Sequence, residues 1–443
     1  MNKKLTVPRG TSDILPDAVL LWEELESQAR KVCKSYGYRE IRTPIYEDIN
    51  LFKRSLGQTS DVVNKQLLEL ASAKEDEGYA LRPEGTAAVV RSYIENSLDG
   101  KESLSKLFYL GPMFRGERPQ KGRLRQFHQI GVEAIGPNST SPYLDAEVIA
   151  LAMHLLEKFE VKGLKLKINS LGTEEDKKNF SSLLRKELAP YKNDLCEECQ
   201  ARFERNIFRI LDCKNEKCKR ILQEKIFTVP LQTKSGAVPV ESATLSFSQD
   251  SLMYFDRVMA CLNDLKIPFE ISRTLVRGLD YYTHTVFEIT AEGLGSQDAV
   301  GAGGRYNGLV HELGGNEKID YGAIGFALGM ERILLASGKI TSAPQQLDVF
   351  VIAMKDEYQP QAFLLLQQLR EAGVRADMSF VSGSMKSQMG KADKANAHFA
   401  LILGEEEIKN HTVALKDMRT SQQETVEIKN IVGILKDKSL IIG

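Results

Sequence analysis

The spacing of apolar residues predicts a helix near the start of the chain, followed by strands. Apolar residues recur at helical intervals from Pro16 to Tyr36, and Gly37 stands where such a helix would end. Residues 38–47 then form a strand-like run whose proline, Pro44, suits an edge or an interface rather than a central strand. Two further strand-like runs flank a polar loop between residues 106 and 136.

The rest of the chain changes character several times, which predicts separate structural units. Residues 173–241 are polar, cysteine-bearing and largely helical in pattern, so we expect an insertion there. Glycine-rich strand patterns return at residues 271–323 and are closed by a helix predicted after Gly325. Beyond a short polar linker at residues 337–346, the order strand, helix, strand, helix, strand is typical of a small α/β domain with a mostly parallel sheet.

Composition narrows the class of protein without indicating a function. Hydrophobic residues make up 42% and charged residues 27% of the 443 positions, as in ordinary globular proteins. The formal net charge is -1, so binding of nucleic acid would depend on local basic surface. The N-terminus lacks a secretory pattern, no run is long enough to span a membrane, and six cysteines are too few for a disulfide scaffold. We therefore expect a cytoplasmic protein of two or three domains.

The segment from Phe114 to Glu133 carries the strongest chemical pattern. Alternation along a strand places an arginine, an aromatic ring, an amide and a carboxylate on one face, beside a glycine gap: Arg125, Phe127, Gln129, Glu133 and Gly131. The loop before this strand holds five cations, which suit phosphate groups: Arg115, Arg118, Lys121, Arg123 and Arg125. A solvated hairpin with incidental charge would explain the same residues, so this pattern alone does not decide between them.

Three shorter segments add candidate ligand groups, each with a structural alternative. Glu84 and Thr86 could hold an ammonium group, although Thr86 could instead cap the next helix. Arg277 precedes paired tyrosines in an apolar strand-like run, where a buried arginine needs either an internal carboxylate or an anionic ligand. Arg332 stands alone on an otherwise apolar helix predicted over residues 325–335, where it could also extend to solvent.

The glycine cluster at residues 301–308 excludes two common nucleotide-binding classes. No Gly-Lys-Ser/Thr follows it, as a P-loop requires, and Tyr306 stands where a dinucleotide fingerprint has its last glycine. A kinase or a dehydrogenase is therefore not indicated, whereas close approach of this backbone to a ligand remains open.

In this order the segments resemble the class II aminoacyl-tRNA synthetases, and among them the histidyl-tRNA synthetases, over nearly the whole chain. The run around Pro44 is similar to the first motif of that class, residues 114–133 to the second and residues 325–335 to the third. Residues 275–288 and 302–309 resemble stretches peculiar to the histidine enzymes.

The resemblance implies an α/β protein with an α+β catalytic domain, in which helices flank an antiparallel sheet. This domain would contain residues 1–172 and 242–336, with the helical insertion at residues 173–241. Residues 346–443 would form an α/β anticodon-binding domain, and the first motif would mediate a homodimer.

The resemblance also implies roles for individual residues. Arg115 would bind the α-phosphate and the reacting carboxylate, and Arg277 would lie against the α-phosphate where related enzymes rely more on a metal ion. Phe127 and Arg332 would enclose the adenine. Glu84, Thr86 and Gln129 would bind the α-ammonium of histidine, and Glu133 and Tyr282 would hydrogen-bond its two ring nitrogens, with Tyr281 beside them. The histidine-binding set would also include Gly85, Arg115 and Arg277.

The implied reaction is ATP-dependent activation of L-histidine to histidyl-adenylate, followed by transfer to the 3′ end of tRNA(His). Arg118 and Gln120 would contact the acceptor end of the tRNA. Fixed arginines and Mg²⁺ would suffice, because phosphoryl transfer depends on positioning and charge stabilisation. The alternative is a non-catalytic paralogue that senses histidine and regulates another enzyme. The retained arginines and the C-terminal α/β domain favour the ligase.

Four cysteines of the insertion have spacing compatible with a tetrahedral zinc site: Cys196, Cys199, Cys213 and Cys218. Zinc could stabilise a small core in this charged region. Four reduced thiols without a metal would also explain the spacing and are the favoured interpretation, because the resemblance to the histidyl-tRNA synthetases requires no metal here.

Overall fold

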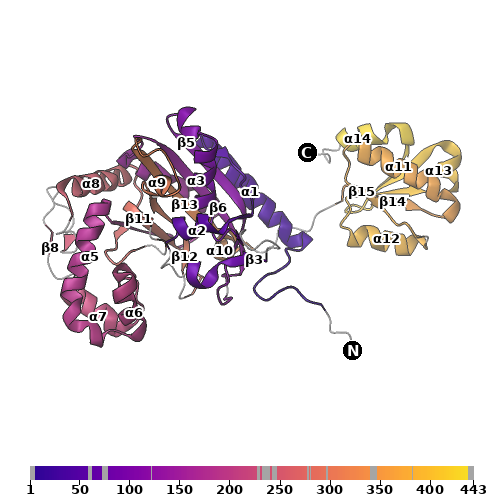
Figure 1. The fold of residues 1–443 in the computed structure, drawn as a ribbon. Helices are drawn as coiled ribbons and strands as arrows, with labels where there is room; N and C mark the ends of the chain where they lie inside the picture. The colour runs from indigo at the N-terminus through magenta and orange to yellow at the C-terminus, as the bar shows by residue number, and fades with distance from the viewer. Residues whose placement is uncertain are drawn as a thin grey trace. The chain divides into compact units, whose positions relative to one another are not determined.

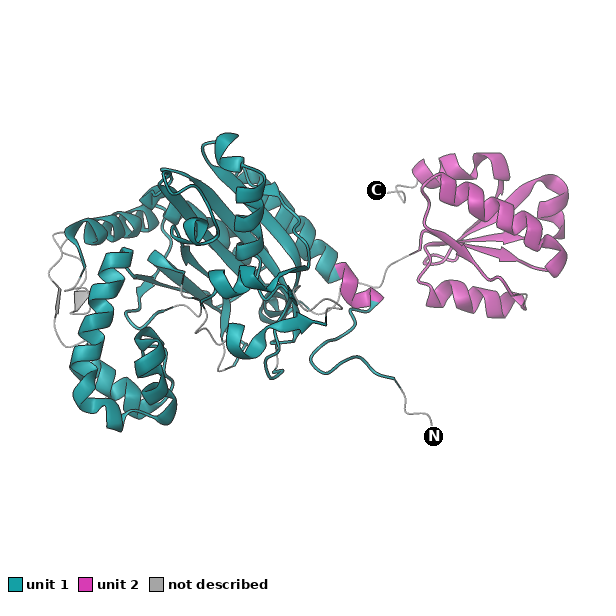
Figure 2. Ribbon diagram, viewed as in Figure 1, with its two compact units in different colours: residues 1–15, 21–340 teal, residues 16–20, 341–443 magenta. Residues whose placement is uncertain are grey.

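The computed structural model divides the chain into two compact units (Figure 2). One unit contains residues 1–15 and 21–340, and the other contains residues 16–20 and 341–443. The structure describes residues 5–57, 62–71, 78–120, 122–226, 230–231, 240–241, 247–276, 279, 281–295, 298–339, 347–381 and 383–437.

An eight-stranded sheet forms the centre of the first unit (Figure 1). Its order is β1-β5-β6-β13-β12-β11-β7-β10, in which the six inner strands pair antiparallel and the two edge strands pair parallel with their neighbours. The strands are β1 (Arg39–Glu40), β5 (Ser105–Phe114), β6 (Gln126–Pro137), β7 (Lys165–Ser170), β10 (Glu270–Ile271), β11 (Thr283–Thr290), β12 (Ala299–Arg305) and β13 (Tyr321–Gly329). The expected antiparallel sheet is confirmed.

Helices cover both faces of this sheet, each through its own hydrophobic cluster. One cluster joins the strands to α1 (Pro16–Ser35), α4 (Pro142–Lys158), α8 (Gln249–Asp264) and α10 (Met330–Ser337). The other joins them to α2 (Ile49–Ser55), α3 (Thr86–Glu95), α9 (Leu309–Glu312) and the insertion. The helix predicted over residues 16–36 is confirmed as α1.

The remaining elements of the first unit are short. A small sheet has the order β2-β4-β3, from β2 (Tyr46–Asp48), β3 (Leu68–Leu70) and β4 (Tyr79–Leu81). A π-helix, η1 (Val62–Gln66), precedes β3, and a 3-10 turn, η2 (Leu98–Gly100), follows α3.

The described residues of the expected insertion, residues 173–241, are largely helical, and their helices lie together at one side of the first unit (Figure 1). It contains α5 (Glu174–Leu188), η3 (Ala189–Asp194), α6 (Glu197–Arg205), η4 (Ile207–Ile210), α7 (Glu216–Lys225) and the paired strands β8 (Pro230–Leu231) and β9 (Val240–Glu241). Helix α5 begins with a capping box in which Thr173 and Asp176 exchange hydrogen bonds.

Strands β5 and β6 form the hairpin that the sequence predicts between residues 106 and 136. The two faces expected for β6 are confirmed, because Ile130 and Val132 join one hydrophobic cluster while Phe127 packs against the other. The strand begins at Gln126 rather than at Leu124.

Two predicted elements differ from the structure. Residues 325–329 are not helical but end strand β13, which pairs with both β6 and β12, so pairing on both sides overrides the helical spacing of its apolar residues. The predicted strand at residues 38–47 is reduced to β1 and β2. Between them the guanidinium of Arg82 donates hydrogen bonds to the carbonyl oxygens of Thr43 and Pro44, which takes the place of strand pairing.

The second unit has a five-stranded sheet of order β15-β14-β16-β17-β18. Strands β14 (Val349–Ala353), β15 (Ala376–Met378) and β16 (Phe399–Leu403) are parallel, as predicted. The sequence pattern did not reveal β17 (Thr412–Asp417) and β18 (Gln423–Glu427), which pair antiparallel. The helical elements are η6 (Asp356–Tyr358), α11 (Gln359–Glu371), α12 (Met385–Lys394), α13 (Glu405–Asn410), η7 (Ile428–Asn430) and α14 (Ile431–Asp437).

In the described ranges, no helix has both the length and the apolar character needed to cross a membrane.

Candidate functional site

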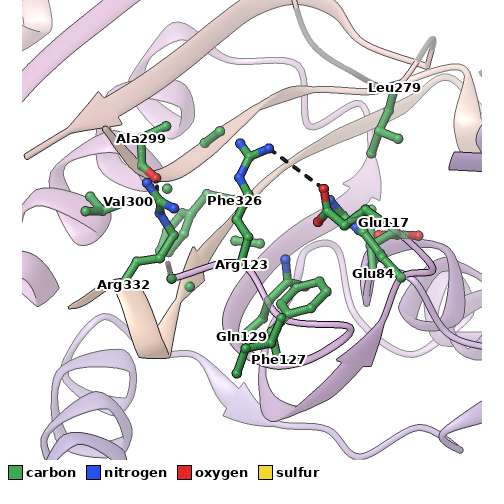
Figure 3. A pocket seen from close by; sticks show the side chains of 18 of the residues that line it. Glu84, Glu117, Arg123, Phe127, Gln129, Leu279, Ala299, Val300, Phe326 and Arg332 are labelled. Atoms are coloured by element: carbon green, nitrogen blue, oxygen red, sulfur yellow. Dashed lines mark hydrogen bonds and ion pairs between the residues drawn. The ribbon is translucent and has the colours of Figure 1, made fainter. Parts of the chain in front are cut away.

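A cavity of about 230 Å³ lies against β6, β12 and β13 in the first unit (Figure 3). Segments far apart in the sequence line it, and they supply carboxylate, hydroxyl, amide, aromatic and guanidinium groups. These segments contribute Glu84 and Thr86; Arg115, Glu117, Arg123, Phe127 and Gln129; Leu279, Tyr281 and Tyr282; Ala299 to Ala302; and Phe326 and Arg332.

Glu84 is held at the start of α3. Its carboxylate accepts hydrogen bonds from the backbone N–H groups of Thr86 and Ala87, at 2.6 and 3.0 Å. Glu84, not Thr86, therefore caps the helix, which corrects the alternative interpretation of Thr86. Burial raises the pKa of Glu84, while the two backbone N–H groups oppose that rise.

Glu133 lies fully buried on β6 and is surrounded by hydroxyl groups. Thr86 Oγ1 donates to Glu133 Oε1 at 2.7 Å, Tyr306 OH donates to Oε2 at 2.5 Å, and Tyr109 OH lies 3.4 Å from Oε1. Burial raises the pKa of Glu133 to about 8, although the hydroxyl groups lower it. Glu133 is not among the residues that line the cavity, but its partner Thr86 is.

Two glycines make room for the Tyr109 ring between α3 and β6. A Cβ atom at Gly85 would lie 2.2 Å from Tyr109 Cζ, and one at Gly131 would lie 2.0 Å from the same atom. The gap that the sequence predicts at Gly131 is therefore filled by its cross-strand neighbour.

Phe127 and Gln129 lie next to each other in one wall of the cavity (Figure 3), which Arg115 also lines. Arg115 Nε donates to the carbonyl oxygen of Pro83 at 2.9 Å, and its guanidinium carbon lies 5.2 Å from the centre of the Phe127 ring. Among the described residues, the buried side-chain oxygen of Gln129 has no hydrogen-bond partner. It can therefore accept a hydrogen bond from a ligand in the cavity.

Arg332 lies on the other side of the cavity, in the first turn of α10. It is buried, and its Nε donates to the carbonyl oxygen of Ala299 at 2.6 Å, so it does not extend to solvent as the structural alternative required. The neighbouring Glu331 fixes α10 to the hairpin, because its carboxylate accepts the backbone N–H of His128 at 3.0 Å. Burial lowers the pKa of Arg115 and of Arg332.

The remaining predicted residues fall into four groups. Tyr281 and Tyr282 are buried, with ring centres 4.6 Å apart, just before β11 rather than inside a strand. Arg118 and Gln120 are exposed on the loop between β5 and β6. Arg277 lies outside the described residues. The four cysteines of the insertion come together away from this cavity.

Sequence reasoning missed two tyrosines that contact Glu133 and one buried ion pair in the same unit. Tyr109 and Tyr306 contact Glu133, but only the sheet register brings them together. Arg305 forms a fully buried ion pair with Asp145 of α4. The one available signal was Gly131, since a glycine in a strand marks close approach by a neighbour.

Comparison with known proteins agrees with this arrangement. The family model described as Histidyl-tRNA synthetase matches residues 10–333, and the model described as Anticodon binding domain matches residues 348–438. The histidine–tRNA ligase of Moorella thermoacetica is 45% identical over 428 residues, covering 96% of each chain. That of Desulforamulus reducens is 42% identical over 440 residues, covering 98% of this chain and 99% of the relative.

Solved structures give the same result. The crystal structure of apo histidyl-tRNA synthetase from S. aureus matches with a TM-score of 0.77 and 36% identity, over 98% of this chain and 100% of that one. A structure described as an ATP phosphoribosyltransferase regulatory subunit/histidyl-tRNA synthetase, from Bacillus halodurans C, has a TM-score of 0.61 at 21% identity, which is a likeness of fold alone. The resemblance inferred from the sequence motifs is confirmed, and the chain belongs to the histidyl-tRNA synthetase family.

Proposed function

We propose that this chain is a histidine–tRNA ligase, which activates L-histidine with ATP and transfers it to the 3′ end of tRNA(His). The observation that carries the proposal is the convergence of Arg115, Phe127 and Arg332 on the same cavity as Glu84, Thr86 and Gln129. The first set suits a nucleotide and the second an amino acid.

The nucleotide would occupy the side of the cavity between Phe127 and Arg332. Its adenine would stack on the Phe127 ring, with the Arg332 guanidinium on the opposite face. Arg115 would contact the α-phosphate and the histidine carboxylate, and Arg277 would contribute a second cation by resemblance to the family. Mg²⁺ commonly binds through substrate phosphates, so we propose that it enters with ATP.

The amino acid would occupy the side near α3. Its ammonium group would donate to Glu84, Thr86 and the unpartnered oxygen of Gln129, beside the close backbone at Gly85. Its imidazole would lie toward Glu133 and Tyr282, with Tyr281 adjacent. A wrong amino acid would leave the buried groups that hydrogen-bond the imidazole without partners. Such a site discriminates by roughly 10⁴–10⁵ without an editing domain.

The reaction would follow from positioning. The histidine carboxylate attacks the α-phosphorus in line, pyrophosphate leaves, and histidyl-adenylate remains. A hydroxyl of the terminal adenosine then attacks the acyl carbon, and AMP leaves. Arg115 would stabilise the charge on the α-phosphate without forming a covalent bond.

The tRNA would contact both units. We propose that Arg118 and Gln120, exposed on the hairpin loop, contact the acceptor end. Residues 346–443 would form the anticodon-binding domain, residues 173–241 the insertion, and residues 1–172 and 242–336 the catalytic domain. We also propose a cytoplasmic homodimer formed through the segment around Pro44, where Ile45 and Tyr46 expose 47% and 50% of their surface.

A pyrophosphate exchange assay with each of the twenty amino acids tests the proposal. We expect exchange into ATP only with histidine, followed by charging of purified tRNA(His). The alternative function, a histidine-sensing regulator, predicts histidine binding without exchange. Exchange that does not depend on histidine would overturn the assignment of the amino acid.

A further inference from the structure

The insertion brings four cysteines from two segments into one cluster. Cys196 immediately precedes α6 and Cys199 lies in its first turn, whereas Cys213 precedes α7 and Cys218 lies in the first turn of α7. Their sulfur atoms all lie within 4.8 Å of one another. The other two cysteines of the chain, Cys33 and Cys261, belong to neither segment.

The spacing of the sulfur atoms suits a single tetrahedral ion. A zinc ion with four Zn–S bonds of about 2.3 Å separates its sulfur ligands by about 3.8 Å. Cys196 Sγ lies 3.8 Å from Cys213 Sγ, which is far longer than a disulfide bond of about 2.05 Å. A cluster of several irons would hold its cysteines farther apart, because its thiolates bind different iron atoms.

The backbone around the cluster favours thiolates. The N–H of Cys196 donates to Cys218 Sγ at 3.2 Å, and the N–H of Asn215 donates to Cys213 Sγ at 3.4 Å. Both helices that carry the cysteines direct their positive N-terminal ends toward the cluster. These groups offset the negative charge that remains when four thiolates bind one divalent cation.

The cluster also has an entrance for a cation. Three of the cysteines are buried and Cys196 is partly exposed. Cys196 and Cys213 border a surface depression in which three acidic residues outnumber two basic ones: Glu197, Glu198 and Asp212 against Arg202 and Lys214. Buried ligands with one exposed member satisfy two requirements of a metal site, a closed coordination sphere and an access path.

The position of the cluster indicates what an ion would stabilise. Cys199, Cys213 and Cys218 are buried in the hydrophobic cluster that joins the insertion to the sheet, and the helices α6 and α7 beside them are short. The turn η4 lies between the two cysteine pairs in the sequence. Phe208 and Arg209 of this turn line a second cavity, of about 220 Å³, together with Leu279 and Tyr282.

We propose that Cys196, Cys199, Cys213 and Cys218 bind one Zn²⁺, which closes the core of the insertion and fixes η4 beside the segment of Tyr282. Each thiol that binds the ion releases its proton, and no electron is transferred. The proposal does not depend on the proposed function, because metal binding is measured without catalysis.

Elemental analysis of the purified full-length chain, expressed without a metal-binding tag in zinc-supplemented medium, tests the proposal. We expect about one zinc per chain in the wild type and in the matched control C261S, and less than about 0.2 per chain in C213S and in C218S. Absence of metal from the wild type, with either free thiols or disulfides, would overturn the proposal. So would iron in place of zinc, or full retention of zinc in both cluster variants.

A cobalt spectrum of the wild type keeps the test decisive if the cluster variants do not fold. Co²⁺ exchanged into the wild-type chain should show intense thiolate-to-cobalt absorption and visible bands of tetrahedral coordination. The spectrum of an octahedral ion would contradict the proposal. An active ligase that contains no zinc would overturn this inference and leave the proposed function intact.

Discussion

At the scale of single residues, Glu133 links the site to the stability of the first unit. It is a carboxyl group with no exposed surface, and only hydroxyl groups of described residues hydrogen-bond to it: those of Thr86, Tyr109 and Tyr306. No cation pairs with it among the described ion pairs. Its charged form is therefore costly in the folded chain.

Stability should accordingly depend on pH through Glu133. Its folded pKa of about 8 lies above its ordinary value of 4.5, so the folded chain retains a proton that the unfolded chain loses between these values. Glu133 should therefore increase the free energy of unfolding below about pH 4.5, and this contribution should be lost as pH rises toward 8. The loss in the wild type should be on the order of a few kcal/mol, and Glu133→Gln should abolish it.

Denaturant unfolding at pH 5 and pH 8 measures this effect, with fluorescence of the single tryptophan, Trp22, as the probe. Trp22 packs against His128 in the first unit, so its emission reports on that unit. Equal pH slopes for the wild type and Glu133→Gln would contradict the prediction.

The ion pair between Arg305 and Asp145 gives a second prediction about stability. Both side chains are fully buried, and Asp145 Oδ1 accepts hydrogen bonds from Arg305 Nε and Nη2 at 2.9 and 2.5 Å. Asp145→Leu leaves a buried cation without its anion, so we expect a loss of about 3–5 kcal/mol. The control Glu95→Gln, at the exposed pair with Arg91, should cost less than about 1 kcal/mol.

Denaturant midpoints compare the two variants. Adding Arg305→Met to Asp145→Leu should recover much of the loss, because an apolar pair removes the uncompensated charge. A loss no larger than that of the Glu95→Gln control would show that the ion pair does not hold α4 against β12.

At the scale of elements, the close contact between β5 and β6 connects packing to histidine binding. Gly131→Ala would place a Cβ atom 2.0 Å from Tyr109 Cζ, so the ring must move away from Glu133. We expect the KM for histidine in the exchange assay to rise about 10-fold, equivalent to about 1.4 kcal/mol, while the KM for ATP changes much less. Gly100→Ala is the matched control, because no atom lies within 4 Å of its added Cβ. Equal increases in both KM values would indicate general distortion of the hairpin.

The sequence predicted elements well where one local pattern decided the structure. Helix α1 and the β5–β6 hairpin are examples, since each follows from apolar spacing and turn residues. It failed at residues 325–329, because pairing with β6 and β12 is a long-range property. The same reason hid Tyr306 from sequence reasoning: its hydroxyl reaches Glu133 only across the sheet.

At the scale of the whole molecule, the two units have separate hydrophobic cores. The clusters of the first unit contain buried residues between Leu25 and Ile333, and those of the second contain buried residues between Val349 and Leu435. No described cluster mixes buried residues of the two units. Each unit therefore meets the basic requirement for independent folding.

This separation predicts that activation and tRNA charging can be uncoupled by truncation. A chain that ends at residue 339 keeps every described residue of the cavity, so histidine-dependent pyrophosphate exchange should remain within a few-fold of the full-length rate. It lacks the segment matched by the anticodon-binding model, residues 348–438, so kcat/KM for tRNA charging should fall about 100-fold, equivalent to about 2.7 kcal/mol of binding. Exchange and charging rates of the same preparations check both expectations. Loss of exchange in a folded truncated chain would show that the second unit contributes to activation, and undiminished charging would show that it does not bind the tRNA.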